Sequence, residues 1–147
     1  MLLCKSAVDA FEQRNSVRET WKAFGLSHPV KVVFVLGLPQ LHLTKKGMKL
    51  QEAVETESRQ HEDILQEGFV DTYQNLTLKS MFSLKFANEY LLNRTDWVML
   101  VDDDSYVNIP QLISFLDTVP KPRNDIIGKV YNFIVITMRC FQHLINV

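Results

Sequence analysis

The chain has 147 residues, a formal net charge of −1 and an isoelectric point near 6.4. This balance excludes the broad basic surface that is typical of nucleic-acid-binding proteins, and we expect no nucleic-acid partner. The length suits one modest domain, and a hydrophobic share of 46% allows that domain a packed core. Charged and polar side chains interrupt the most apolar late stretch, residues 126–145, so we expect no membrane span.

Helical and strand patterns alternate in the first half of the chain. Residues 1–5 are too short for a signal peptide. Residues 6–24 repeat apolar side chains at a loose helical spacing, and residues 30–37 are almost all apolar, as in a central strand covered on both faces. Residues 49–61 predict a charged surface helix whose glutamates, including Glu57, are solvated.

The alternation continues in the second half. Residues 63–70 predict a short strand and a turn, and residues 71–92 predict a helix with a broad apolar stripe that faces the core. A buried strand at residues 97–101 and a short helix at residues 109–116 follow. Residues 125–130 could begin another strand. The alternating order predicts an α/β layer fold with a mostly parallel sheet.

Three aspartates, Asp102, Asp103 and Asp104, follow directly after the predicted strand at residues 97–101, and we call them the acidic triplet. Unpaired charges are too costly to bury, so the triplet should emerge at the edge of the sheet, where open α/β sheets bind ligands. In extended backbone, Asp102 and Asp104 would share one side, about 7 Å apart, and Asp103 would face the other. That spacing suits one hard cation with one neighbouring polar group.

The residues alone leave four interpretations of the acidic triplet open. It can hold a divalent cation that neutralises a diphosphate, because Mg²⁺ and Mn²⁺ prefer carboxylate and phosphate oxygens. A phosphatase of the haloacid dehalogenase type is disfavoured, because Tyr106 stands where that pattern has Thr or Val. An EF-hand calcium loop is disfavoured, because Val107 stands where the loop needs Gly. The fourth interpretation is a solvated acidic turn.

Two arginines and two cysteines carry weaker signals. Arg14 and Arg18 lie four residues apart and share a helix face. They fit either a solvated basic face or an anion site for a phosphate-bearing ligand. Cys4 and Cys140 form no disulfide framework, and their spacing does not reveal whether they pair.

Five separated stretches share their residues, order and spacing with one enzyme family. They are residues 14–21 (RNSVRETW), 33–37 (VFVLG), 57–65 (ESRQHEDIL), 69–79 (FVDTYQNLTLK) and 102–108 (DDDSYVN). On these stretches the chain resembles the β-1,3-glycosyltransferases, which include β-1,3-galactosyltransferases, β-1,3-N-acetylglucosaminyltransferases and their Brainiac-like and Fringe-like relatives. The resemblance covers roughly residues 1–128 and is most specific over residues 69–79.

The resemblance implies a GT-A type, Rossmann-like fold, of which residues 1–128 form the nucleotide-sugar-binding half of a truncated domain. It implies transfer of a sugar from a UDP-sugar to an acceptor glycan in β-1,3 linkage, with inversion at the anomeric carbon. It also implies Mn²⁺ as the cofactor. The metal-binding residues that it implies are Asp104 and Asp102, and the donor-binding residues are Asp102, Asp103, Arg14 and Arg18.

The resemblance leaves the roles of three further residues open and does not extend to the end of the chain. Asp71, Tyr73 and Lys79 either shape the donor pocket or hold a helix against the sheet. Residues 129–147 do not match and are expected to be an unrelated tail. The family's acceptor-binding half, with the base that an inverting transfer needs, is not matched, so the catalytic base stays unassigned. The alternative function is a truncated, non-catalytic product that binds UDP-sugar or a full-length partner.

Family membership also implies a location and a modification. The parent protein would be anchored in the Golgi membrane and act on its lumenal side, on glycans of proteins or lipids. The chain itself shows no targeting segment or anchor. In that compartment the Asn-X-Thr triplets at Asn75 and Asn93 are candidates for N-glycosylation.

Overall fold

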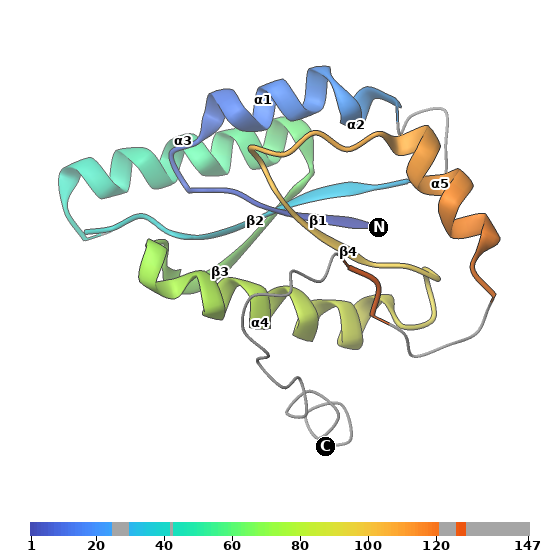
Figure 1. The fold of residues 1–147 in the computed structure, drawn as a ribbon. Helices are drawn as coiled ribbons and strands as arrows, with labels where there is room; N and C mark the ends of the chain where they lie inside the picture. Colours follow the sequence, from blue (N-terminus) through green and yellow to red (C-terminus); the bar gives the residue numbers. More distant parts are fainter. Residues whose placement is uncertain (25–29, 42, 121–125, 129–147) are drawn as a thin grey trace. The chain divides into compact units, whose positions relative to one another are not determined.

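A four-stranded sheet, parallel at every pairing, forms the centre of the first of two units of the chain, Met1–Leu116. The structure is a computed structural model and describes residues 1–24, 30–41, 43–120 and 126–128. The second unit is Asp117–Val147. The strand order is β3-β2-β1-β4 (Figure 1), with β1 at Leu2–Lys5, β2 at Val32–Leu38, β3 at Ile64–Val70 and β4 at Met99–Asp102. The predicted α/β fold with a parallel sheet is confirmed.

Helices cover both faces of the sheet. One face carries α1, α2 and α3, and the opposite face carries α4 (Figure 1). The helices are α1 (Phe11–Glu19), α2 (Trp21–Phe24), α3 (Lys45–His61), the short 3-10 helix η2 (Tyr73–Asn75), α4 (Leu76–Phe86), the π-helical turn η3 (Ala87–Leu91) and α5 (Ile109–Thr118).

The chain order creates one reversal point in the sheet. From β1 the chain moves outward through β2 to β3, and it then returns to place β4 on the other side of β1. In sheets of this kind, ligands bind in the crevice outside the carboxyl ends of the strands at such a reversal. The loops after β1 and β4 therefore border the expected ligand site.

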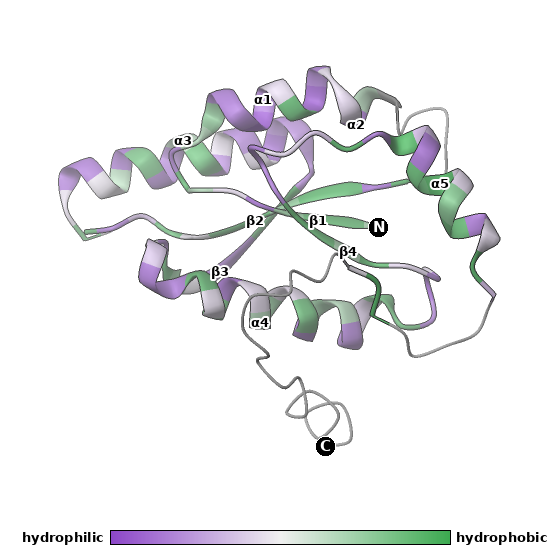
Figure 2. Ribbon diagram, viewed as in Figure 1, coloured by the Kyte–Doolittle hydropathy of each residue, from purple (hydrophilic) through white to green (hydrophobic). Residues whose placement is uncertain are grey.

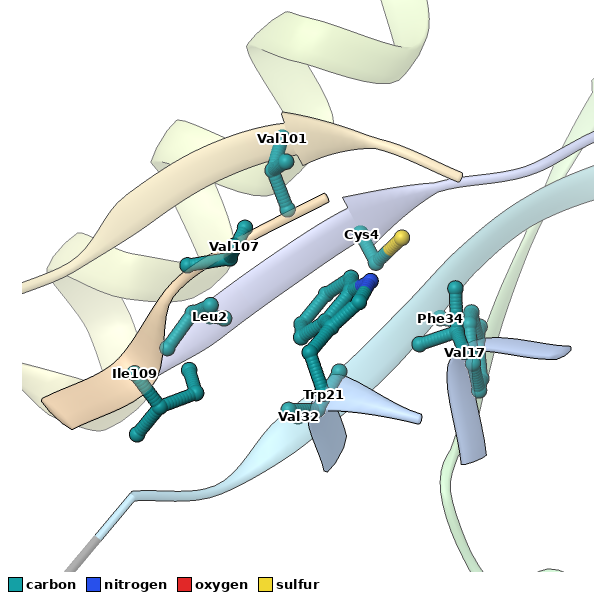
Figure 3. Packing of buried hydrophobic residues seen from close by; sticks show 9 residues of the cluster. All are labelled: Leu2, Cys4, Val17, Trp21, Val32, Phe34, Val101, Val107 and Ile109. Atoms are coloured by element: carbon teal, nitrogen blue, oxygen red, sulfur yellow. The ribbon is translucent and has the colours of Figure 1, made fainter. Parts of the chain in front are cut away.

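The main core lies between the sheet and the helices of the first face. Leu2 and Cys4 are two residues apart on β1, so they point to the same side, and the Trp21 ring lies beside them (Figure 3). Hydrophobic residues dominate β1, β2 and β4, whereas the helices carry hydrophilic residues as well (Figure 2). The buried members of this core are Leu2, Cys4, Val17, Trp21, Val32, Phe34, Val101, Val107 and Ile109.

The first strand is the main element that the sequence pattern missed. The sequence pattern assigned no element to residues 1–5, and in the structure β1 pairs with β2 on one side and with β4 on the other. Four residues at the start of a chain are too short to show a period. The predicted helix at residues 6–24 also begins later, at Phe11, and residues 6–10 form the β1–α1 loop.

The prediction that the apolar stripe along residues 71–92 faces the core needs correction over α4. Leu78, Met81 and Leu84 of this stripe are exposed, and the buried positions of α4 are Lys79 and Ser83. Lys79 and Ser83 are one helical turn apart, so they define the face that meets the sheet. A buried lysine, described below, therefore sets the rotation of this helix.

Three further predicted elements are confirmed, and a fourth lies partly outside the residues that the structure describes. The strand at residues 30–37, the surface helix at residues 49–61 and the short helix at residues 109–116 correspond to β2, α3 and α5. Of the strand expected at residues 125–130, only residues 126–128 are described, and they form no strand. Across the described parts of the chain, no helix combines the length and apolarity needed to cross a membrane.

Gly37 on β2 offers a test of how closely the strand ends pack. A Cβ atom built there would lie 2.6 Å from the carbonyl oxygen of Phe69 and 2.8 Å from its ring. We expect Gly37→Ala to lower the free energy of unfolding by about 1–3 kcal/mol, because backbone on β3 must move. Gly68→Ala is the matched control, since nothing lies within 4 Å of the added atom. Equal urea midpoints for both variants would contradict this packing.

Candidate functional site

The acidic triplet lies where β4 ends, at the reversal point of the sheet. The strand stops at Asp102, and a turn follows in which the Ser105 amide donates to the Asp102 carbonyl at 3.2 Å. The Asp103 amide donates to the carbonyl of Lys5, at the end of β1, also at 3.2 Å. The predicted alternation of side chains along an extended strand is therefore wrong beyond Asp102, because the backbone turns there.

The three carboxylates have different surroundings. Asp102 forms an ion pair with Lys5 at 3.0 Å, and its side chain is 55% exposed. Asp103 is half-buried, and its Oδ2 atom is buried without a hydrogen-bond partner in the described part of the chain. Asp104 is exposed, with the Ser105 hydroxyl 3.5 Å from its Oδ1 atom. Asp104 thus presents an exposed carboxylate, whereas the unpartnered oxygen of Asp103 is covered by the protein.

The acidic triplet fits a divalent cation that is shared with a ligand. Hard cations take carboxylate oxygens, and Mg²⁺-like ions are commonly held by one or two carboxylates together with substrate phosphates. No group of three or more His, Cys, Asp and Glu side chains in the described residues is placed to enclose a metal. The exposed carboxylate of Asp104 and the unpartnered, buried Oδ2 of Asp103 are the candidate oxygens for the two-carboxylate case.

The pKa of the buried Cys4 thiol is affected by the negative charge of this edge of the sheet. Its burial, followed by the nearby charges of Asp103, Asp102 and Asp104, raises the pKa of the thiol to about 12. The thiol is therefore protonated at neutral pH. Cys4 is free and buried, and Cys140 lies outside the described residues.

Arg14 is buried beneath the loop that follows β1, where it bonds a carboxylate of α3. Its Nε and Nη2 atoms donate to Glu57 at 2.9 and 2.7 Å. The remaining N–H groups reach the Ser6 hydroxyl at 3.1 Å, the Ala7 carbonyl at 2.6 Å and the Val8 carbonyl at 3.4 Å. All five N–H groups of Arg14 are used within the protein, so none is left for a diphosphate.

Arg18 extends the same network toward β3. It donates to Glu57 at 2.7 Å and to Asp63 at 2.8 and 2.9 Å, and Lys22 also bonds Asp63. The expectation of a solvated basic face is wrong, and so is the expectation that Glu57 is solvated, because Glu57 is only 8% exposed. The guanidinium of Arg18 also lies over the Phe34 ring, 4.9 Å from its centre.

These contacts shift the pKa values of both carboxylates in the network. Burial alone would raise the pKa of Glu57, but hydrogen bonds from Arg14 and Arg18 outweigh it and hold the pKa below its usual value. Burial likewise opposes the hydrogen bonds from Arg18 and Lys22 to Asp63, whose pKa is again lowered. Both carboxylates are therefore ionised at neutral pH.

Lys79 is a second buried cation that contacts the loop after β1, from the opposite face of the sheet. Its buried ammonium bonds Asp71 at 2.7 Å and the carbonyl of Ser6 at 2.6 Å. Asp71 in turn accepts the amide of Gly37 at 3.0 Å, which joins the end of β2 to the residue after β3. Asp71 and Lys79 thus hold α4 against the strand ends, while the Tyr73 side chain is exposed.

The comparison with known proteins decides the family. The family model described as Galactosyltransferase matches residues 12–142. The chain belongs to the galactosyltransferase family. The match extends beyond residue 128, where the motif resemblance was expected to end.

Several members of the galactosyltransferase family are similar to this chain. The human lactosylceramide 1,3-N-acetyl-beta-D-glucosaminyltransferase is 32% identical, over 81% of this chain and 32% of that protein. The mouse beta-1,3-galactosyltransferase 4 is 36% identical, over 79% and 30%. The Drosophila melanogaster beta-1,3-galactosyltransferase brn is 37% identical, over 78% and 33%. The chain spans about a third of the length of these relatives.

The structure of this galactosyltransferase family member separates the two glycosylation candidates. The Asn75 side-chain amide donates to the Val70 carbonyl at 2.8 Å, where it closes the turn between β3 and α4. Asn93 is exposed in the turn after η3. Only Asn93 therefore presents a side chain that is free of a structural hydrogen bond to the described backbone.

The arginine–carboxylate network predicts a loss of stability in acid. Glu57 and Asp63 have ordinary pKa values of 4.5 and 3.8 and lower values in the folded protein. Their contribution to stability is complete above the ordinary values and is lost as the pH falls toward the lower, folded-state ones. We expect urea denaturation from pH 7 to pH 3 to show this loss.

A double variant, Glu57→Gln with Asp63→Asn, tests the cause. It should be less stable than the wild type at pH 7, by about 3 kcal/mol or more, and should lose less stability on acidification. Glu55→Gln, at an exposed position of α3, is the control and should leave the pH dependence unchanged. A double variant with the wild-type pH dependence would contradict the assignment.

Proposed function

We propose that this chain carries the donor-binding half of an inverting β-1,3-hexosyltransferase, which transfers galactose or an N-acetylhexosamine from a UDP-sugar to an acceptor glycan. One observation carries the proposal: in a member of the galactosyltransferase family, the acidic triplet lies at the reversal point of a Rossmann-like sheet. Relatives named for transfer to lactosylceramide and to O-glycosylated glycoproteins support glycan acceptors on lipid or protein.

In this proposal, Mn²⁺ is the cofactor, and Asp104 provides its direct protein contact. Asp103, whose Oδ2 atom has no hydrogen-bond partner in the described part of the chain, would contact the donor or a water of the metal. Asp102, whose Oδ1 atom pairs with Lys5, would contribute its other oxygen to the same site. When bound, Mn²⁺ supplies positive charge beside the diphosphate of the departing nucleotide.

The β1–α1 loop forms the other border of the proposed donor site. Arg14 binds the Ser6 hydroxyl from one face of the sheet, and Lys79 binds the Ser6 carbonyl from the other. Fixed loops of this kind reduce the entropy that is lost when a ligand binds. We therefore assign Arg14 and Arg18 to the support of the site and not to direct contact with the donor.

The remaining steps of transfer need residues beyond those described. Inversion requires a base that deprotonates the attacking hydroxyl, and we assign no described residue to this role. We place the complete enzyme at the lumenal side of the Golgi membrane, where nucleotide sugars and acceptor glycans meet. UDP binding without transfer by this chain would favour the alternative, a product that binds only the donor.

Nucleotide binding tests the donor site. Titration calorimetry should show UDP binding in the presence of Mn²⁺ and at least tenfold weaker binding with EDTA. We expect Asp104→Asn to abolish the metal dependence, because the amide is a weaker ligand for a hard cation. Glu55→Gln, which removes an exposed carboxylate from α3, should bind UDP as the wild type does. The absence of metal-dependent heat in the wild type would refute the donor site.

Glycosylation in the secretory pathway tests which of the two candidate asparagines the fold leaves accessible. The chain can be directed into the secretory pathway of cultured cells by a heterologous leader, and its mobility compared before and after treatment with an endoglycosidase. We expect Asn93→Gln to remove the mobility shift, because Asn93 is exposed. Asn75→Gln should retain it, because the Asn75 amide is bonded to Val70. The opposite pattern would contradict the described turn at the start of α4.

A further inference from the structure

Lys5 lies at the reversal point of the sheet, directly opposite the acidic triplet. It is the last residue of β1 and the register partner of Asp102 on β4. Its Nζ atom is 3.0 Å from Asp102 Oδ1, and the lysine side chain is 20% exposed. The sequence motifs gave Lys5 no role. The structure places its ammonium at the edge where the nucleotide diphosphate is proposed to bind.

In the part of the chain that the structure describes, two other cations contact the loop after β1, and both already have protein partners. Arg14 is fully buried and donates every N–H group to protein oxygens. Lys79 is buried and is shared between Asp71 and the Ser6 carbonyl. Lys5 differs from both, because it is partly exposed and its ion-pair partner is itself largely exposed.

The charge balance of this edge indicates a role for Lys5 in binding an anionic ligand. The acidic triplet carries three formal negative charges, of which a divalent cation brought by the ligand would offset two and the Lys5 ammonium the third. A diphosphate adds further negative charge to the same edge. Without a cation of the protein beside it, the diphosphate would meet the carboxylate of Asp102 directly.

We propose that Lys5 is a donor-binding residue, whose ammonium pairs with Asp102 in the free protein and donates to a diphosphate oxygen when the nucleotide binds. This assignment rests on the proposed function. The change of partner costs little, because the ammonium exchanges one charge-assisted hydrogen bond to an anionic oxygen for another. The lysine ammonium is a point charge on a flexible stem, so it can turn from one anion to the other.

The proposal predicts opposite effects on two ligands. Removal of the ammonium leaves the acidic triplet more negative, so Mn²⁺ alone should bind as tightly as before or severalfold more tightly. The same removal takes a cation from the diphosphate, so UDP should bind more weakly. A lysine that merely holds β1 to β4 would weaken both ligands together when it is lost.

The experiment compares Lys5→Met and Lys5→Arg with the wild type. Free Mn²⁺ is followed by electron paramagnetic resonance without nucleotide, and UDP and inorganic pyrophosphate are titrated by calorimetry at saturating Mn²⁺. We expect Lys5→Met to weaken the binding of UDP and of pyrophosphate about tenfold, a common effect for a charged contact. Lys5→Arg keeps the positive charge and should retain most of the wild-type affinity. Lys31→Met, which removes an exposed lysine just before β2 at the opposite ends of the strands, is the matched control.

The outcomes separate this proposal from the proposed function. UDP binding by Lys5→Met with the wild-type dissociation constant would overturn the role of Lys5 and leave the donor site standing. Parallel losses of Mn²⁺ and UDP affinity, with a lower melting temperature, would also overturn it, in favour of a structural role. A wild-type protein that binds Mn²⁺ but neither UDP nor pyrophosphate would refute the donor site itself, and Lys5 with it.

Discussion

The fold depends on a buried bond between the Arg14 guanidinium and the Glu57 carboxylate. A buried ion pair is costly unless every donor and acceptor is satisfied, and here the remaining N–H groups of Arg14 reach the loop after β1. The hydrogen bonds of Arg14 therefore join α1, α3 and the loop at the end of β1. Removing Glu57 would leave the buried guanidinium of Arg14 without a counter-ion, whereas Glu57 would keep Arg18 if Arg14 were removed.

The second buried cation, Lys79, completes the constraint from the opposite face. Ser6 receives Arg14 on its hydroxyl and Lys79 on its carbonyl, so the first residue after β1 is fixed from both sides of the sheet. The same bond explains the exposed apolar stripe of α4. A helix must turn its single buried lysine toward Asp71, and the apolar side chains such as Leu78 and Met81 on its other faces are then left outside.

These long-range bonds mark the limit of what the sequence could predict. The parallel α/β fold, β2, α3 and the position of the acidic triplet followed from local periodicity and from an apolar run that ends in charge. The burial of Glu57 did not, because its partner Arg14 lies 43 residues away, and Lys79 lies 73 residues from the Ser6 carbonyl. Local patterns assign a charged side chain to the surface, and only the folded chain shows which charges have partners.

The two borders of the proposed donor site are built on different principles. Around the loop after β1, the cations are buried, neutralised and fixed, so this border is rigid before any ligand arrives. After β4, the carboxylates are partly exposed, and among the described residues only Asp102 forms an ion pair, with Lys5. In the proposed function, a divalent cation would relieve the electrostatic repulsion within the triplet and would in turn attract a diphosphate. A ligand that brings both charges would therefore complement this border, while the loop after β1 would determine where the ligand lies.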